Sequence, residues 1–233
     1  IAAAGLEPAA ELIDTAILGQ FNTLWVASLA ATNSFLGSFA WIFSFLSYGV
    51  TVGIAQNLGQ KKTHEIGSQI KLALWIAIIL GLFVALILGL GKEVLLSRIL
   101  GAQDNLVQSA SAYWDIRVYG YPFVLISLAL VGVLRGLQKI TFTMYLALII
   151  TGVNAVGSYL AVYVLGWGIK GAATATVMSF IIGDCIAITY ILRSFKKWGL
   201  DFFKPIQAKH IKELGSDGIN LFGRTACLLA SLF

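Results

Sequence analysis

The sequence predicts an all-α polytopic membrane protein. Its 233 residues are 58% hydrophobic and only 12% charged, and the mean hydropathy is +0.86. A soluble domain averages about 45–50% apolar and roughly 25% charged residues. This composition excludes a soluble globular enzyme, because too little polar surface would remain to keep the folded chain in solution. No alternating ten-residue strand pattern recurs, so helices are the expected elements.

Apolar run lengths and turn signals predict six complete spans and the start of a seventh. The runs cover residues 3–21, 24–58, 69–90, 104–137, 140–165 and 168–192, and a last run starts near residue 220. The second run is longer than a bilayer needs, so it should tilt, bend or extend beyond the lipid. Residues 59–68 are expected to form a polar loop, and residues 92–101 an amphipathic helix at the membrane interface.

The basic residues are distributed unevenly between the two sides of the predicted bundle. The loops between spans two and three, four and five, and six and seven, with the span ends next to them, carry eleven Lys and Arg residues, against three in the opposite loops and span ends. This bias predicts that the basic loops and the N-terminus are cytoplasmic. We therefore expect a multi-pass protein of the cell (inner) membrane. The bias also explains the net charge of +5 without any nucleic-acid partner.

Other function classes lack their motifs. The phosphate-binding pattern GxxxxGK[ST] is absent, which argues against an ATP-driven pump within this chain. The two histidines fall in polar loops, so no catalytic triad and no metal-ligand spacing can be assembled. We expect neither an enzyme nor a cofactor, and any transport should be driven by an ion gradient or by the gradient of the solute itself.

Carboxylates inside a predicted span are the most informative polar residues. Asp14 lies in the middle of an apolar run, and Glu7 and Glu11 precede it at helical spacing on the same face. Ionisable groups within spans are costly and tend to be functional. Three acids on one stripe cannot all be ionised in a medium of low dielectric. At least one should hold a proton, or the acids should share a bound cation.

The remaining polar residues within spans have structural interpretations as well. Asp115 and Arg117 are two residues apart and point to different helix faces, so each should find a partner on another helix. Asn154 and Ser158 share one face of span five. Hydroxyls and amides in spans usually make packing hydrogen bonds. Arg224 in the last run is another candidate for a structural buried charge.

Five short strings follow one another along the chain: PAAELIDTAILG, GIAQNLGQKK, YWDIRVYGYP, LVGVLRGLQ and GIKGAATATVMS. This ordered set resembles the multidrug and toxic compound extrusion (MATE) family, and within it the DNA-damage-inducible protein F (DinF-like) branch. The resemblance implies a twelve-helix antiporter of two six-helix lobes, with sites near the membrane midplane. Residues 1–192 would be the N-terminal lobe, 193–218 a basic cytoplasmic connector and 219–233 the start of the second lobe. The chain begins with Ile1 and ends within an apolar run, so we expect a longer parent protein.

The resemblance also implies candidate site residues. Asp14 matches the family's aspartate in the first helix, which is implicated in cation coupling and substrate contact. Asn154 matches the asparagine of the family's N-x-x-x-D pattern, but Ser158 stands where the aspartate is expected. Thr176 and Tyr113 match polar positions near the same cavity. The family usually has small or apolar residues in place of Glu11.

The expected function is therefore a cation-coupled efflux antiporter for small cationic or amphipathic compounds. Without the acid at position 158, protonation of Asp14 is favoured over a full sodium site, although Glu11 could supply a second acid and keeps sodium open. Three alternatives remain. They are a flippase for lipid-linked oligosaccharide or peptidoglycan precursors, an organic-acid exporter, and a non-transporting subunit of a membrane assembly.

Overall fold

The computed structural model describes residues 6–20, 23–100 and 104–194, and within these ranges all regular structure is helical. The elements in chain order are α1 (Leu6–Gly19), α2 (Thr23–Ile42), α3 (Ser44–Gly59), α4 (Thr63–Leu90), α5 (Lys92–Leu100), α6 (Asp104–Tyr119), α7 (Tyr121–Gly136), α8 (Ile140–Tyr159), the π-helix η2 (Leu160–Val164) and α9 (Gly168–Ser194). The predicted connector 193–218 lies outside the described residues from position 195 on, and so does all of segment 219–233.

Four helical segments in this part of the chain are long and apolar enough to cross a membrane, or five if a bent pair counts as one span. They are Thr23–Gly59, Glu65–Leu90, Ile140–Val164 and Gly168–Ser194, together with the bent pair Val107–Tyr119 and Tyr121–Gly136. The all-α, multi-pass prediction is confirmed. The first predicted span is not among these segments, because α1 has only 14 described helical residues. At 1.5 Å per residue such a helix is about 21 Å long, shorter than a hydrocarbon core of roughly 30 Å.

Two predicted spans are divided in the structure. Span two consists of α2 and α3, which are separated at Phe43 within one continuous apolar segment, Thr23–Gly59. Span four was predicted as one helix and is instead bent by 48° between α6 and α7, around Gly120. Pro122 lies in the first turn of α7 and has no amide to donate, so it cannot continue the hydrogen bonds of α6.

The predicted polar loop 59–68 is too long. Helix α4 already begins at Thr63, because a compact turn ends α3 and lets the chain reverse within a few residues. In this turn Lys61 has a φ of 57°, and the amide of Lys62 donates to a carbonyl five residues earlier over 2.9 Å. The turn between α7 and α8 repeats the arrangement, with Gln138 at a φ of 59° and a bond of 2.8 Å from the amide of Lys139. Both turns thus satisfy carbonyls at a helix end.

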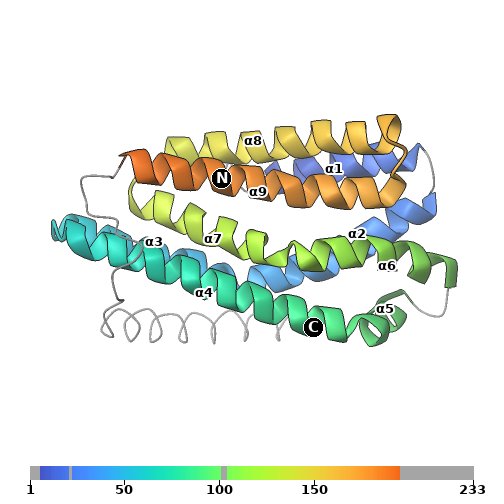
Figure 1. Ribbon diagram of the computed structural model, residues 1–233, viewed down its shortest axis with the longest axis horizontal. Helices are drawn as coiled ribbons and strands as arrows, with labels where there is room; N and C mark the ends of the chain where they lie inside the picture. Colours follow the sequence, from blue (N-terminus) through green and yellow to red (C-terminus); the bar gives the residue numbers. More distant parts are fainter. Residues whose placement is uncertain (1–5, 21–22, 101–103, 195–233) are drawn as a thin grey trace.

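Helix α7 lies in the centre of the bundle. It packs against α3 and α4 on one side and against α8 and α9 on the other, while α1 packs on α8 (Figure 1). The contact with α3 is close, because a Cβ atom at Gly132 would lie 2.6 Å from the carbonyl oxygen of Ser47. Thr51 on α3 also donates a hydrogen bond to the Gly132 carbonyl over 3.0 Å. Small residues at such contacts are typical of helix packing in lipid.

Replacing Gly132 by alanine should therefore destabilise the bundle. The added methyl group meets backbone atoms of Ser47 that no side-chain rotation can move, and overpacking of this kind costs about 1–3 kcal/mol. The expected result is a lower midpoint of thermal unfolding in detergent. Gly152→Ala on α8 is the matched control, since a Cβ atom there meets nothing within 4 Å. An equal midpoint for the two variants would contradict the close contact of α3 with α7.

Candidate transport site

Asp14 is buried on α1. Its side chain is 3% exposed, although α1 lies at the edge of the described bundle. Helix α1 packs against α8, which carries Asn154 and Ser158, and contacts α9, which carries Thr176. Glu11 lies three residues earlier on the same helix, and its side chain lies outside what the structure describes. Asp14 is therefore buried on a helix that packs against α8, where the sequence predicted the other site residues Asn154 and Ser158.

Asn154 and Thr176 are brought together across the contact of α8 with α9. The Asn154 amide nitrogen donates to the Thr176 hydroxyl over 3.0 Å, and that hydroxyl donates to the Ala172 carbonyl over 2.9 Å. The helices approach closely here, because a Cβ atom at Gly157 would lie 3.1 Å from that of Ala175. The resemblance named this pair as polar residues near one cavity, and the structure joins them directly.

Two oxygens on the same face of α8 lack a hydrogen bond within the described structure. They are the side-chain carbonyl of Asn154 and the hydroxyl of Ser158, and both residues are at most 2% exposed. Buried polar atoms normally have partners. Orphaned neutral oxygens next to a helix that carries a buried carboxyl can therefore accept hydrogen bonds or coordinate a small cation. Within the described residues no group of three or more His, Cys, Asp or Glu side chains could hold a metal ion.

Tyr113 is completely buried, and its hydroxyl donates to the side-chain carbonyl of Asn33 on α2 over 2.9 Å. Sequence reasoning missed Asn33, although an amide within an apolar run could have signalled it. Tyr113 also belongs to an apolar cluster with residues of α1, α2, η2 and α9, among them Leu18, Leu29 and Val162. Leu18 is one helical turn from Asp14. This cluster therefore begins one turn along α1 from the buried acid.

The predicted charges of α6 have different surroundings. Asp115 makes an ion pair with Lys92 on α5 over 2.6 Å, which confirms the expected partner on another helix. Its side chain is 48% exposed, so it is less buried than an intramembrane charge should be. Two nitrogens of Arg117, Nε and Nη1, are buried without a hydrogen-bond partner in the described structure, so no ion pair is seen for this residue. Arg224 lies outside the described residues.

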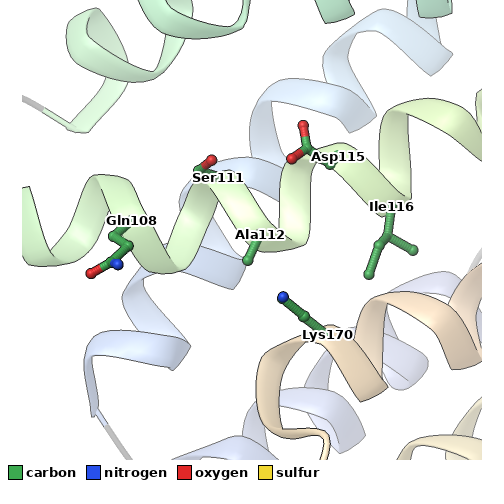
Figure 2. Close-up of a pocket in the computed structure, with 6 residues that line it drawn as sticks. All are labelled: Gln108, Ser111, Ala112, Asp115, Ile116 and Lys170. Atoms are coloured by element: carbon green, nitrogen blue, oxygen red, sulfur yellow. The ribbon is translucent and has the colours of Figure 1, made fainter.

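Asp115 lines a pocket with a volume of about 360 Å³. The other lining residues come from α6, apart from Lys170 of α9 on the opposite wall (Figure 2). Lys170 points toward α6 near Ala112, while the carboxylate of Asp115 is turned away from it. This pocket contains none of Asp14, Asn154 and Thr176, so it is distinct from the predicted site.

The comparisons with known proteins agree with this architecture. The profile of the MatE family matches residues 2–160, and the chain belongs to this family. Its members are transporters and not enzymes. The chain is 28% identical to Protein DETOXIFICATION 47, chloroplastic, of Arabidopsis thaliana, over 75% of this chain and 32% of that protein. It is 26% identical to the probable multidrug resistance protein YoeA of Bacillus subtilis, over 87% of this chain and 44% of that protein.

Solved structures share the fold. A MOP superfamily transporter from Pyrococcus furiosus superposes with a TM-score of 0.87 at 18% identity, over 100% of this chain and 52% of its own length. The outward-facing conformation of a multidrug resistance MATE family transporter gives a TM-score of 0.86 at 19% identity, again over 100% and 52%. The chain thus spans about half the length of these transporters, and less than half of the curated relatives named above.

The bond between Asn154 and Thr176 should be measurable as an interaction energy. In a double-mutant cycle of Asn154→Ala and Thr176→Val, the destabilisations should be non-additive by about 0.5–1.5 kcal/mol, because either change alone already removes the bond. Thermal or denaturant unfolding in detergent provides the measurement. Thr174→Val is the matched control on α9, since Thr174 bonds to the Lys170 carbonyl of its own helix. Additive effects in the first cycle would contradict the contact.

Proposed function

We propose that this chain forms one lobe of a cation-coupled antiporter that exports small cationic or amphipathic compounds. The observation that carries the proposal is the buried carboxyl of Asp14 on α1, packed against the helix with the orphaned oxygens of Asn154 and Ser158. A buried acid next to unsatisfied neutral oxygens can bind a cation or the cationic group of a substrate. The names of relatives such as YoeA, a probable multidrug resistance protein, support the substrate class.

The coupling ion in this proposal is the proton and not sodium. A sodium ion needs several oxygens and usually more than one negative charge. At α8 the oxygens of Asn154 and Ser158 are neutral, which leaves Asp14 as the described acid of the site. A single buried carboxyl takes up a proton readily, because the neutral acid avoids the cost of a buried charge. Glu11 is the residue that would restore a second acid and favour sodium.

The transport cycle we propose is alternating access. A proton from outside binds Asp14, neutralises it and displaces the substrate. When the site faces the cytoplasm, the proton leaves and a new substrate molecule binds. Since proton and substrate share one carboxyl, each must lower the affinity of the other by the same factor. The burial of Asp14 supports this cycle, because in the conformation described the acid is kept from water, with Leu18 of the apolar cluster one helical turn away.

The proposed orientation has the N-terminus on the cytoplasmic side of the cell (inner) membrane. The charges of the described loops support it. The turns from α3 to α4 and from α7 to α8 lie at one end of the bundle, whereas α5 and the start of α9 lie toward the other end (Figure 1). The first two turns and the helix ends next to them carry Lys61, Lys62, Arg135 and Lys139, and the opposite elements carry Lys92 and Lys170. The end with more Lys and Arg residues faces the cytoplasm in most membrane proteins.

The alternatives have less support. A flippase for lipid-linked precursors, or an organic-acid exporter, needs several basic groups in its cavity to hold phosphate or carboxylate. Arg117 and Arg224 are the arginines expected within the membrane, since Arg135 lies two residues from the end of span four and belongs with the loop charges. A purely structural subunit would not need a buried acid. The ordered strings in the sequence also support the DinF-like branch, which we propose for this chain.

Replacing Asp14 by asparagine should abolish proton-driven efflux. Asparagine keeps the size of the side chain but cannot exchange a proton, so the variant should insert and fold while transport stops. The measurement is dye efflux from vesicles with a pH gradient or a sodium gradient imposed separately. Glu93→Gln on α5, where the acid is exposed, is the control and should transport like the wild type. Full efflux by Asp14→Asn would refute the mechanism, and efflux driven by sodium alone would reverse the choice of ion.

The 233-residue chain by itself should not transport. The solved relatives are about twice as long, and one lobe would line only half of a cavity between two lobes. We expect no dye efflux from vesicles that contain this chain alone. Efflux should appear when a second six-helix lobe is supplied in the same reading frame or by co-expression. Gradient-driven efflux by the chain alone would contradict the proposed division into lobes.

A further inference from the structure

A second buried carboxyl lies near the middle of α9. Asp184 is only 4% exposed, so the described helices alone are enough to bury it. It is eight residues from Thr176, which corresponds to about 12 Å along the helix at 1.5 Å per residue. One bound ion cannot contact both positions. Asp184 is therefore separate from the site around Asn154 and Thr176.

The surroundings of Asp184 do not compensate an ionised carboxylate. The hydroxyl of Ser127 on α7 donates a hydrogen bond to its Oδ1 atom. The other oxygen, Oδ2, is buried and has no hydrogen-bond partner within the described structure. A buried charge normally needs an opposite charge and several donors. A single neutral hydroxyl supplies neither, so the neutral acid is the stable form in this conformation.

No ion pair to Asp184 is seen in the described part of the chain, and the nearby charges of α5 and α6, Lys92 and Asp115, pair with each other. The titratable groups on α9 and the helices packed against it make other contacts or face outward. Arg117 interacts with Tyr121 at the bend, and the Tyr121 hydroxyl bonds to the Leu36 carbonyl. The others with described side chains are Asp14, Tyr113, Asp115 in its ion pair with Lys92, Tyr190 with its ring stacked on Phe142, and the exposed Tyr119, Arg135, Lys139, Tyr145, Tyr159, Tyr163, Lys170, Cys185 and Arg193.

The contact between Ser127 and Asp184 lies next to a point where the structure is bent. Helix α7 starts directly after the 48° bend at Gly120. The bend itself packs on α9, because a Cβ atom at Gly120 would lie 2.3 Å from Val177. Ser127 is two turns beyond the bend on α7, and Asp184 is two turns beyond Val177 on α9. A change of the bend angle would therefore move the hydroxyl relative to the carboxyl.

We propose that Asp184, with Ser127, is a second proton-binding site of this lobe, independent of Asp14. In the conformation described, the carboxyl holds a proton. When α7 and α9 separate, the Ser127 hydroxyl moves away from the carboxyl, water reaches the group, the proton passes from the acid to water, and water hydrates the resulting carboxylate. The role of this second site in a transport cycle rests on the proton-coupled transport proposed above. An asparagine would make the same neutral hydrogen bond, but only an acid can exchange a proton.

The test is difference infrared spectroscopy of the purified, lipid-reconstituted protein over a pH titration. A protonated carboxylic acid has a carbonyl stretching band that disappears on ionisation. We expect one such band to be absent from Asp184→Asn, retained in Asp14→Asn, and shifted in Ser127→Ala, which keeps the acid but removes the hydroxyl. In the wild type this band should lose intensity as the pH is raised.

Two results would overturn the proposal. If Asp184→Asn has the same acid bands as the wild type, the carboxyl is already ionised. If the band persists at every pH at which the protein stays folded, Asp184 is permanently neutral and structural. The infrared measurement does not depend on transport. Failure of the proposed function would instead appear as a lack of gradient-driven efflux in the wild type, so the two failures can be told apart. In that efflux assay we expect Asp184→Asn to change the dependence of the rate on pH, whereas Glu93→Gln should not.

Discussion

The contact of α7 with α3 at Gly132 is the constraint on which the other helix positions depend. In lipid, helices are not driven together by the hydrophobic effect, so close packing and interhelical hydrogen bonds must hold them. At Gly132 both are present, since the missing side chain admits the backbone of Ser47 and the carbonyl accepts a bond from Thr51. With α7 fixed on this side, its opposite face determines where α9 lies, and through α9 the position of α8.

The buried polar pairs of this bundle lie where two helices pack closely. Asn154 and Thr176 face each other where Gly157 approaches Ala175, and Ser127 meets Asp184 where α7 contacts α9. The groups that remain unsatisfied are therefore informative, since the surrounding packing leaves them no freedom to find a partner. The oxygens on α8 and the second oxygen of Asp184 are in this situation. A lobe with two separated carboxyls could bind protons at two stages of a cycle.

Much of the fold could be predicted from the sequence, because run length and loop charge depend on local composition. The bounds of α8 and α9 follow from apolar runs flanked by turn residues, and the burial of Asp14 from its place in such a run. The division of span four at Gly120 was not predicted. Whether a proline in an apolar run bends the helix depends on how neighbouring helices pack against it, as α9 does here through Val177. Contacts such as that of Tyr113 with Asn33 join residues 80 positions apart, and no sequence periodicity encodes them.

The two matching turns, at Lys61 and Gln138, have a consequence for how the chain enters a membrane. Each joins two apolar helical segments, α3 to α4 and α7 to α8, and each satisfies its own backbone carbonyls without help from the rest of the bundle. In a pair of helices joined in this way, the turn has its backbone hydrogen bonds before the pair contacts any other helix. In the orientation proposed above, its basic residues resist translocation and keep the turn on the cytoplasmic side. The bundle could then be assembled from two preformed hairpins, with the contact of α3 and α7 as the step that joins them.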